Sequence, residues 1–131
     1  MTYALDSSTV IHYFKGRGRI GERLLAAPFP EVALPAVVLY ELEVGVEKSA
    51  SPEMRRAELE AFASALTLLP FGAAEAKAAA RIRAALEDQG QQIGPNDILI
   101  AGTALANGAI LVTTNTDELS RVPGLAIEDW F

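Results

Sequence analysis

Three acidic residues stand where the sequence predicts at least partial burial. Asp97 falls in the first turn of a helix that is apolar on nearly every side, and Gly94 and Pro95 before it are helix-start signals. Asp6 directly follows a short β-prone stretch. Glu41 lies at the centre of an apolar stripe, because successive helical residues are rotated by about 100°. A buried carboxylate is costly unless it is paired, hydrogen-bonded or bound to a metal.

Each of these acids also has a purely structural interpretation. Asp97 in a first turn would favour the helix dipole by about 0.3 to 1 kcal/mol. Glu41 could form a salt bridge with one of eight arginines. Three inward-facing acids together favour a metal site over these structural roles, because like charges repel and are stable in ionised form mainly around a cation. Oxygen ligands in a chain with no cysteine and one histidine select Mg²⁺ or Mn²⁺ over zinc.

Further polar residues follow a predicted strand at residues 110–113. Asn115 and Asp117 could reach the same edge as the three acids, although turn chemistry explains both residues equally well. His12 is the only histidine and stands beside Tyr13 and Phe14, which favours a packing role over that of a catalytic base.

Strands and helices alternate along the chain. Strand-like stretches stand at residues 2–5, 31–34, 67–69, 110–113 and 125–127. Helical patterns cover residues 8–15, 19–27, 36–48, 52–66, 73–88 and 95–106, and residues 114–124 are predicted to be a loop. This alternation predicts a three-layer α/β/α sandwich with a short, mostly parallel sheet. Ligands bind at the carboxyl ends of such strands, which is where Asp6 is expected.

The helix predicted at residues 36–48 has more than one apolar side. Glu43 and Glu47 project away from Glu41 and are predicted to face solvent. A further apolar face consists of Leu39, Leu42 and Val46. We expect this helix to pack on two sides, one of which could be an interface.

Composition limits the classes of protein to which the chain can belong. With 131 residues and 50% hydrophobic content, we expect a single domain over residues 1–131. The absence of cysteine, of a signal sequence and of a membrane-spanning apolar run favours the cytoplasm. The net charge of −6 argues against non-specific nucleic-acid binding. Lys15, Arg17, Arg19 and Arg23 nevertheless lie within nine residues and form either a solvated face or a phosphate track.

Four motifs, spread over most of the chain, carry a family resemblance. They are Leu-Asp-Ser-Ser at 5 to 8, Tyr-Glu-Leu-Glu-Val-Gly at 40 to 45, Gly-Pro-Asn-Asp-Ile-Leu-Ile-Ala at 94 to 101, and Leu-Val-Thr-Thr-Asn at 111 to 115, which leads into Val-Pro-Gly-Leu-Ala-Ile-Glu-Asp-Trp at 122 to 130. In this order and at these separations, the sequence resembles the PIN-domain ribonucleases, and within them the VapC-type toxins of toxin–antitoxin pairs.

The resemblance implies which residues form the site. Asp6, Glu41 and Asp97 are expected to hold Mg²⁺, for which Mn²⁺ can substitute. Ser7, Ser8 and Thr113 match small polar positions that hydrogen-bond around the acids. Asn115 stands where many relatives carry a fourth acid, which puts a fully populated second metal site in doubt. Asp117 could compensate if the loop after Thr113 turned it inward, but two residues further on it is expected to face solvent and cap the turn.

The resemblance also implies a function and partners. We expect a Mg²⁺-dependent endoribonuclease toxin in which a metal-activated water attacks an RNA phosphodiester. We also expect a homodimer and a VapB-like antitoxin that occludes the acidic site. Two alternatives come from other functional classes. The first is a response-regulator-like phosphoacceptor, but that class needs a lysine just after a late strand, which this chain lacks. The second is a non-catalytic binding module that has kept the fold.

Overall fold

Five parallel strands form one sheet in the computed structural model, which describes residues 1–131 except for the side chain of Phe29. The strands are β1 (Tyr3–Leu5), β2 (Val32–Pro35), β3 (Thr67–Leu69), β4 (Ile110–Val112) and β5 (Ile127–Glu128), in the spatial order β3-β2-β1-β4-β5. Ala4 in the central strand pairs with Ala33 on one side and Leu111 on the other. Strands covered on both faces need continuous apolar sequence, and these central positions are fully buried.

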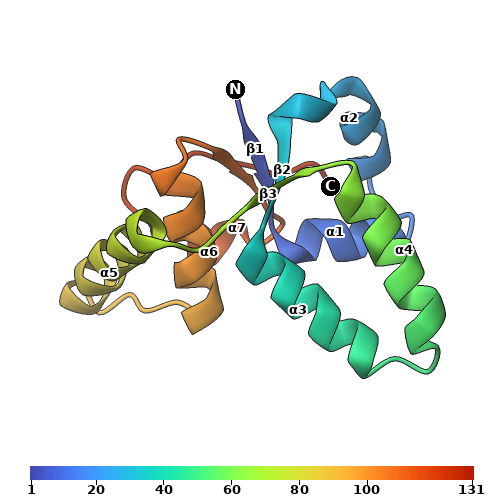
Figure 1. Ribbon diagram of the computed structural model, residues 1–131. Helices are drawn as coiled ribbons and strands as arrows, with labels where there is room; N and C mark the ends of the chain where they lie inside the picture. Colours follow the sequence, from blue (N-terminus) through green and yellow to red (C-terminus); the bar gives the residue numbers. More distant parts are fainter.

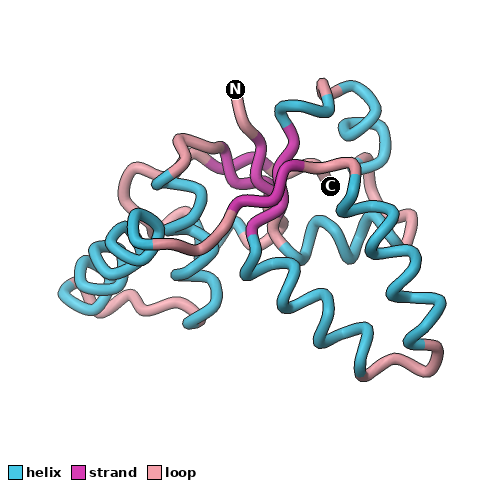
Figure 2. The backbone as a smooth tube through the Cα atoms, viewed as in Figure 1, coloured by secondary structure: helices cyan, strands magenta, loops and turns pink.

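Helices cover both faces of the sheet, as Figures 1 and 2 show. Their bounds are α1 (Ser7–Phe14), α2 (Ile20–Ala26), α3 (Ala36–Glu47), α4 (Pro52–Ser64), α5 (Ala73–Asp88), α6 (Pro95–Ala106) and the one-turn α7 (Thr116–Leu119), with a 3₁₀ turn at Phe29–Glu31. In Figure 1, α5 and α6 lie to the left of the strands, and α1, α2 and α4 lie to the right. The predicted three-layer α/β/α arrangement with a parallel sheet is confirmed.

The close contact between α5 and α6 depends on Gly102. A Cβ atom at this position would lie 2.7 Å from the backbone nitrogen of Ala79, so the two helix backbones are nearly in contact. Around it, α6 is buried on almost every side, with Ile100, Ala101 and Ala104 fully inaccessible. This helix carries Asp97 in its first turn, and its packing therefore positions the site.

The predicted second apolar face of α3 belongs to the core. Leu42 and Val46 are 8% and 7% exposed, so most of their surface packs inside the chain. The expectation that one side of this helix serves as an interface stays a prediction, because Leu42 and Val46 also line an open groove. The helix period identifies an apolar face but does not reveal what covers it, and here α1 and α4 do. Glu43, predicted to face solvent, is half-buried, and Arg56 of α4 forms ion pairs with both Glu43 and Glu47.

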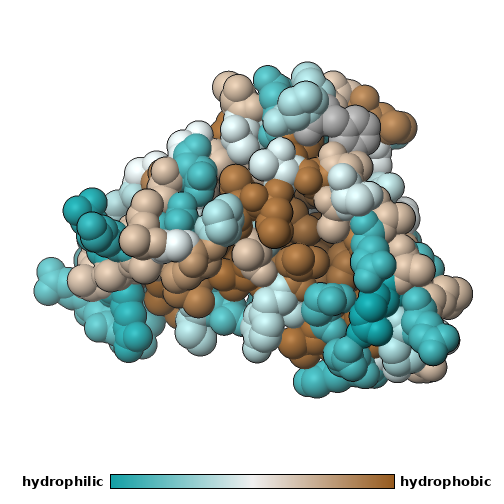
Figure 3. Space-filling view, viewed as in Figure 1, coloured by the Kyte–Doolittle hydropathy of each residue, from teal (hydrophilic) through white to brown (hydrophobic). Residues whose placement is uncertain are grey.

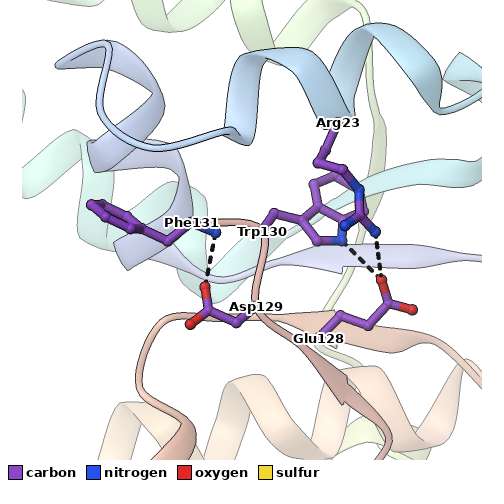
Figure 4. Close-up of polar contacts among 5 residues, drawn as sticks. All are labelled: Arg23, Glu128, Asp129, Trp130 and Phe131. Carbon is purple, nitrogen blue, oxygen red and sulfur yellow. Dashed lines mark hydrogen bonds and ion pairs between the residues drawn. The ribbon is translucent and has the colours of Figure 1, made fainter.

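The C-terminal residues fold back onto the segment that joins α1 to α2 (Figure 4). Glu128 accepts hydrogen bonds from Arg23 at 3.1 Å and from the Trp130 indole at 2.9 Å, and the Arg23 guanidinium lies 5.1 Å from the centroid of the Trp130 ring. The backbone oxygen of Phe131 accepts a hydrogen bond from the Arg19 N–H at 2.9 Å. These contacts hold residues 15–19 in a defined position.

Substitutions at Gly18 and Gly16 can measure how much the packing of the C-terminal residues on this segment contributes to the free energy of unfolding. Both have φ near +65°, but a Cβ atom on Gly18 would lie 2.6 Å from the Phe131 oxygen, whereas nothing lies within 4 Å of one on Gly16. We expect Gly16→Ala to lower the free energy of unfolding by about 1 kcal/mol through backbone strain alone. Gly18→Ala should lower it by about 2 to 4 kcal/mol, since the C-terminus must also move. Equal urea midpoints for the two variants would contradict this.

No helix formed by the described residues is long and apolar enough to cross a membrane.

Candidate active site

Asp6 stands at the carboxyl end of the central strand, and its two carboxylate oxygens accept three hydrogen bonds. Its side chain is 3% exposed. One oxygen accepts the Ser7 N–H at 2.8 Å, and the other accepts the hydroxyls of Thr113 at 2.7 Å and Ser8 at 3.3 Å. The Asp6 backbone is also fixed, because its N–H donates a hydrogen bond to the Val112 carbonyl at 2.9 Å. Ser7, Ser8 and Thr113, three of the residues expected around the acids, therefore donate hydrogen bonds to Asp6.

Glu41 reaches the same region from the second turn of α3. Its Oε1 accepts the Ser7 hydroxyl at 3.0 Å, and its Oε2 accepts the side-chain amide of Asn96 at 3.3 Å. Ser7 thus links α1 to α3 beside Asp6, and Asn96 links α3 to the first turn of α6. Asn96 was not among the predicted site residues, although it directly precedes Asp97 in the sequence.

Asp97 is the acid whose protonation is most altered by the fold. Burial, followed by the negative charges of Asp6, Glu118 and Glu41 and a hydrogen bond with Glu118, raises the pKa of Asp97 to about 6. Among the described side chains, none of these four carboxylates lies within ion-pair distance of a lysine, arginine or histidine. The structure therefore brings Asp6, Glu41 and Asp97 together as an acidic cluster whose charges are not compensated.

Glu118 is the acidic residue that sequence reasoning missed. It belongs to α7, a single helical turn in the stretch predicted to be a loop. Its Oε2 accepts the side-chain amide of Asn115 at 3.1 Å, and the Asn115 N–H donates to the Thr113 hydroxyl at 3.0 Å. Asn115, which lacks a charge, thus orients a carboxylate three residues later. The spacing Asn115-Thr-Asp-Glu118 at a strand end was the signal that could have revealed this pair.

Asp117 does not join the cluster. It is exposed, and Ser120 contacts its backbone carbonyl rather than its carboxylate. Asp117 faces solvent, as expected, and Glu118 approaches Asp97 instead, because adjacent residues in a helical turn point about 100° apart. His12 packs edge-on against Phe131, with ring centroids 4.9 Å apart, as its predicted packing role requires.

These acids supply the oxygen ligands that a hard cation prefers, but they do not form a preformed cage around an ion. No three acidic or histidine side chains in the described part of the chain converge closely enough to form a ready-made cage. Like charges repel, and each carboxylate except Asp97 is instead held by hydroxyl and amide donors. All the candidate donors are oxygens, which fit Mg²⁺ or Mn²⁺. The pKa of Asp97 is raised first by burial and then by the neighbouring carboxylates, whose negative charge a cation would offset.

A groove opens beside the cluster, between α1, α3 and α4. Its volume is about 400 Å³, and Glu41 forms part of its wall. The other lining residues are Ile11, Phe14, Lys15, Leu42, Gly45, Val46, Ser49, Arg55, Glu58 and Leu59. Most of this wall is apolar, and Ile11 and Phe14 expose 43% and 37% of their surface. We call it the α1–α3–α4 groove.

Comparison with known proteins identifies the family. The PIN domain family matches residues 3–125. The chain is a PIN-domain protein. Within this family it is 38% identical over 130 residues to the tRNA(fMet)-specific endonuclease VapC of Shigella flexneri, covering 99% of this chain and 98% of that protein. It is 40% identical over 132 residues to Ribonuclease VapC2 of Rickettsia felis, with the same coverage.

Solved VapBC complexes contain the same fold. This PIN domain superposes on a chain of the DNA-bound VapBC of Salmonella typhimurium with a TM-score of 0.94 and 36% identity, covering 100% of this chain and 99% of that one. For VapBC2 of Rickettsia felis, bound to a DNA fragment from its promoter, the TM-score is 0.93 with 35% identity and full coverage of both chains. The resemblance to PIN-domain ribonucleases of the VapC type is confirmed, and the chain belongs to the VapC proteins.

Glu118 and Asp117 form a matched pair for testing the fourth acid. Both are neighbouring acids on α7, so neutralising either changes the net charge equally. We expect Glu118→Gln to weaken Mn²⁺ binding by about 10- to 100-fold, because it removes a carboxylate next to Asp97. Asp117→Asn should bind Mn²⁺ within about two-fold of the parent. Calorimetry that finds the two variants equal, or the order reversed, would exclude Glu118 from the site.

Proposed function

We propose that this chain is a divalent-metal-dependent endoribonuclease and the toxin of a toxin–antitoxin pair, acting in the cytoplasm. The observation that carries the proposal is the uncompensated cluster of Asp6, Glu41, Asp97 and Glu118 at the carboxyl end of a parallel sheet. Membership of the VapC proteins supports the choice of RNA as substrate, and the absence of cysteine supports the compartment. The phosphoacceptor and the non-catalytic module lose their support, because relatives matched over nearly the whole chain are endonucleases and ribonucleases by name.

In this proposal Asp6 and Asp97 hold Mg²⁺, or Mn²⁺ in its place, with Glu41 and Glu118 beside them. When bound, the ion supplies Lewis-acid chemistry: it offsets charge on the phosphate oxygens and makes water near the phosphorus more acidic. Thr113 and Ser8 fix the orientation of Asp6, and Asn115 does the same for Glu118. In the metal-free site the pKa of Asp97 is raised to about 6 by burial and by the neighbouring carboxylates, and a bound cation would offset these effects and keep the carboxylate ionised near neutral pH.

Cleavage assays with purified chain test the activity. RNA should be cut in buffer that contains Mg²⁺ or Mn²⁺, and EDTA should stop the reaction. Sequencing the RNA ends would identify the substrate. Unchanged cleavage in EDTA would refute the metal requirement, and an absence of cleavage of total cellular RNA with either ion would refute the enzyme.

We also propose that a VapB-like antitoxin occupies the α1–α3–α4 groove. The wall is apolar along α1 and α3 and ends at Glu41, so an apolar segment carrying one basic side chain would match both features. VapBC complexes among the similar structures support such a partner. An antitoxin lying there would cover the approach to the acidic cluster.

Ile11 offers a direct test of that position. It is 43% exposed and lines the groove, whereas Leu25 on α2 is 86% exposed and lies outside the groove. We expect Ile11→Glu to weaken the antitoxin complex by about 100-fold, because a charge would be placed against an apolar partner. Leu25→Glu should bind as the parent does. Calorimetric titration that finds equal affinity for both variants would place the antitoxin elsewhere.

We propose a homodimer through the edge of the sheet at β3. Figure 3 shows apolar residues gathered across the middle of the face that contains this edge. Leu68 of β3 is 52% exposed beside a hollow of about 310 Å³ lined by Leu34, Leu39, Leu59 and Ala63 among others. An unpaired, apolar strand edge favours association. Light scattering that gives 13.9 kDa, the mass of one chain, for the purified protein would exclude the dimer.

A further inference from the structure

We propose that residues 15–19, here called the basic loop, bind the phosphate backbone of the RNA next to the active site; this rests on the ribonuclease function proposed above. Lys15, Arg17 and Arg19 are all exposed, and none lies within 4.0 Å of an acid among the described side chains. In a chain of net charge −6, three uncompensated cations within five residues form a local positive surface. Arg23, the fourth member of the sequence cluster, is held by Glu128 and Trp130 and is not part of this surface (Figure 4).

The basic loop lies at the opposite end of α1 from the acidic cluster. α1 begins directly after Asp6, and its eight residues span about 12 Å before Lys15. Lys15 and Glu41 line the same α1–α3–α4 groove, so the loop and the cluster border one continuous surface. An RNA strand with one phosphate at the acids could therefore place a nearby phosphate at the loop.

The backbone of the basic loop is already held in a defined conformation. Arg17 donates its N–H to the His12 carbonyl at 3.0 Å, and Arg19 donates its N–H to the Phe131 carbonyl at 2.9 Å. Gly16 and Gly18 adopt φ of +66° and +65°, which turns the chain between the basic side chains. Because the backbone is fixed before RNA arrives, binding does not have to order this loop, and the conformational cost at the loop is limited to its three exposed side chains.

The chemistry of the loop favours phosphate over an acidic protein surface. Arginine presents a planar fork of donors that matches phosphate oxygens, and two of the three cations are arginines. Contacts to phosphate are independent of sequence, so the loop contributes affinity for RNA and leaves the chemical step to the acidic cluster. The acids themselves repel the RNA backbone, which makes a nearby cationic contact necessary for productive binding.

Binding of single-stranded RNA to chains that also carry Asp97→Asn, which prevents cleavage, tests the assignment. The double variant Arg17→Gln/Arg19→Gln removes two charges from the loop. Its control, Lys77→Gln/Arg81→Gln, removes two cations of α5 that also have no acid partner among the described residues. In Figure 1, α5 lies on the opposite side of the strands from α1 and α2, which the basic loop joins. We expect the loop variant to bind at least 10-fold more weakly than the control. The slope of log K against log salt should fall by about 0.7 for each lost phosphate contact.

Two further measurements separate this inference from alternatives. In chains with Asp97 intact, the loop variant should raise KM for RNA and leave kcat and Mn²⁺ affinity within about two-fold of the control variant. RNA binding equal to the control's, or a loss of antitoxin affinity with RNA affinity kept, would overturn the assignment while the ribonuclease proposal stands. If the parent chain neither binds nor cleaves RNA, both the basic-loop assignment and the ribonuclease proposal are wrong.

Discussion

Asp97→Asn is expected to reduce RNA cleavage on the order of 10³-fold or more, because it removes a charged oxygen donor from the site that holds the metal. The fold should remain intact, since asparagine has the same shape and the first turn of α6 starts from Gly94 and Pro95, not from the carboxylate. Asn96→Ala on the same turn is the control, and it should keep most activity because Glu41 retains the Ser7 hydroxyl. Cleavage by Asp97→Asn within 10-fold of the parent would refute the metal site.

The same substitution should change how stability depends on pH. The folded-state pKa of Asp97, about 6, lies above the value near 3.9 of an unperturbed aspartate. Proton binding therefore stabilises the fold below about pH 4, and this stabilisation is lost as pH rises through about 6. Without metal, Asp97→Asn should be more stable than the parent above pH 7, by about 1 to 2 kcal/mol after allowance for partial exposure.

Mn²⁺ should reverse this order of stability. A cation that binds only the folded parent raises its free energy of unfolding by mass action, while the amide variant gains little. Below about pH 6 the proton competes for the Asp97 carboxylate, so the Mn²⁺ effect on the parent should fade there. Thermal melts from pH 4 to 8 test both predictions: Asp97→Asn should be the more stable protein without Mn²⁺, and the parent should be the more stable one with it.

Gly102→Ala is expected to lower the free energy of unfolding by about 3 kcal/mol or more. The added Cβ would lie 2.7 to 2.8 Å from backbone and Cβ atoms of Ala79, and a backbone cannot move aside as a flexible side chain can. α5 must separate from α6, and Asp97 at the start of α6 should move with it. Activity should then fall together with stability.

Gly45→Ala in α3 is the matched control for that loss. It is the same substitution within a helix, but nothing lies within 4 Å of the added Cβ. We expect it to raise the free energy of unfolding by about 0.5 to 1 kcal/mol, the ordinary gain of alanine over glycine in a helix. If urea melts show similar changes for both variants, the α5–α6 contact is not as rigid as its geometry indicates.

Much of this arrangement was predictable because local chemistry and long-range packing agree. The alanine-rich α5 matches its predicted bounds of 73–88, and Gly94 and Pro95 place Asp97 in the first turn of α6 as expected. Asp6 follows the central strand, which alone puts it at the ligand-binding edge. In these cases propensity, start signals and burial all indicate the same element.

The remaining features depend on tertiary contacts. α7 is a single turn, too short for propensity to reveal, and it is formed against neighbours that hold Asn115 and Leu119. Without that turn, the only sign that Glu118 belongs to the site was its spacing from Asn115 after a strand. The burial of Leu42 and Val46 was equally hidden, because the helix period is the same whether a partner protein or the chain's own α1 and α4 covers the face.

The strand order has a consequence for synthesis of the chain on the ribosome. β1, made first, occupies the middle of the sheet, and its neighbour β4 is made about a hundred residues later, as the pairing of Tyr3 with Ile110 shows. Until β4 and α7 have emerged, Asp6 has no Thr113 hydroxyl and Asp97 has no Glu118. We therefore expect a nascent or truncated chain that ends before β4 to lack the assembled acidic cluster and to remain inactive until these last elements have left the ribosome.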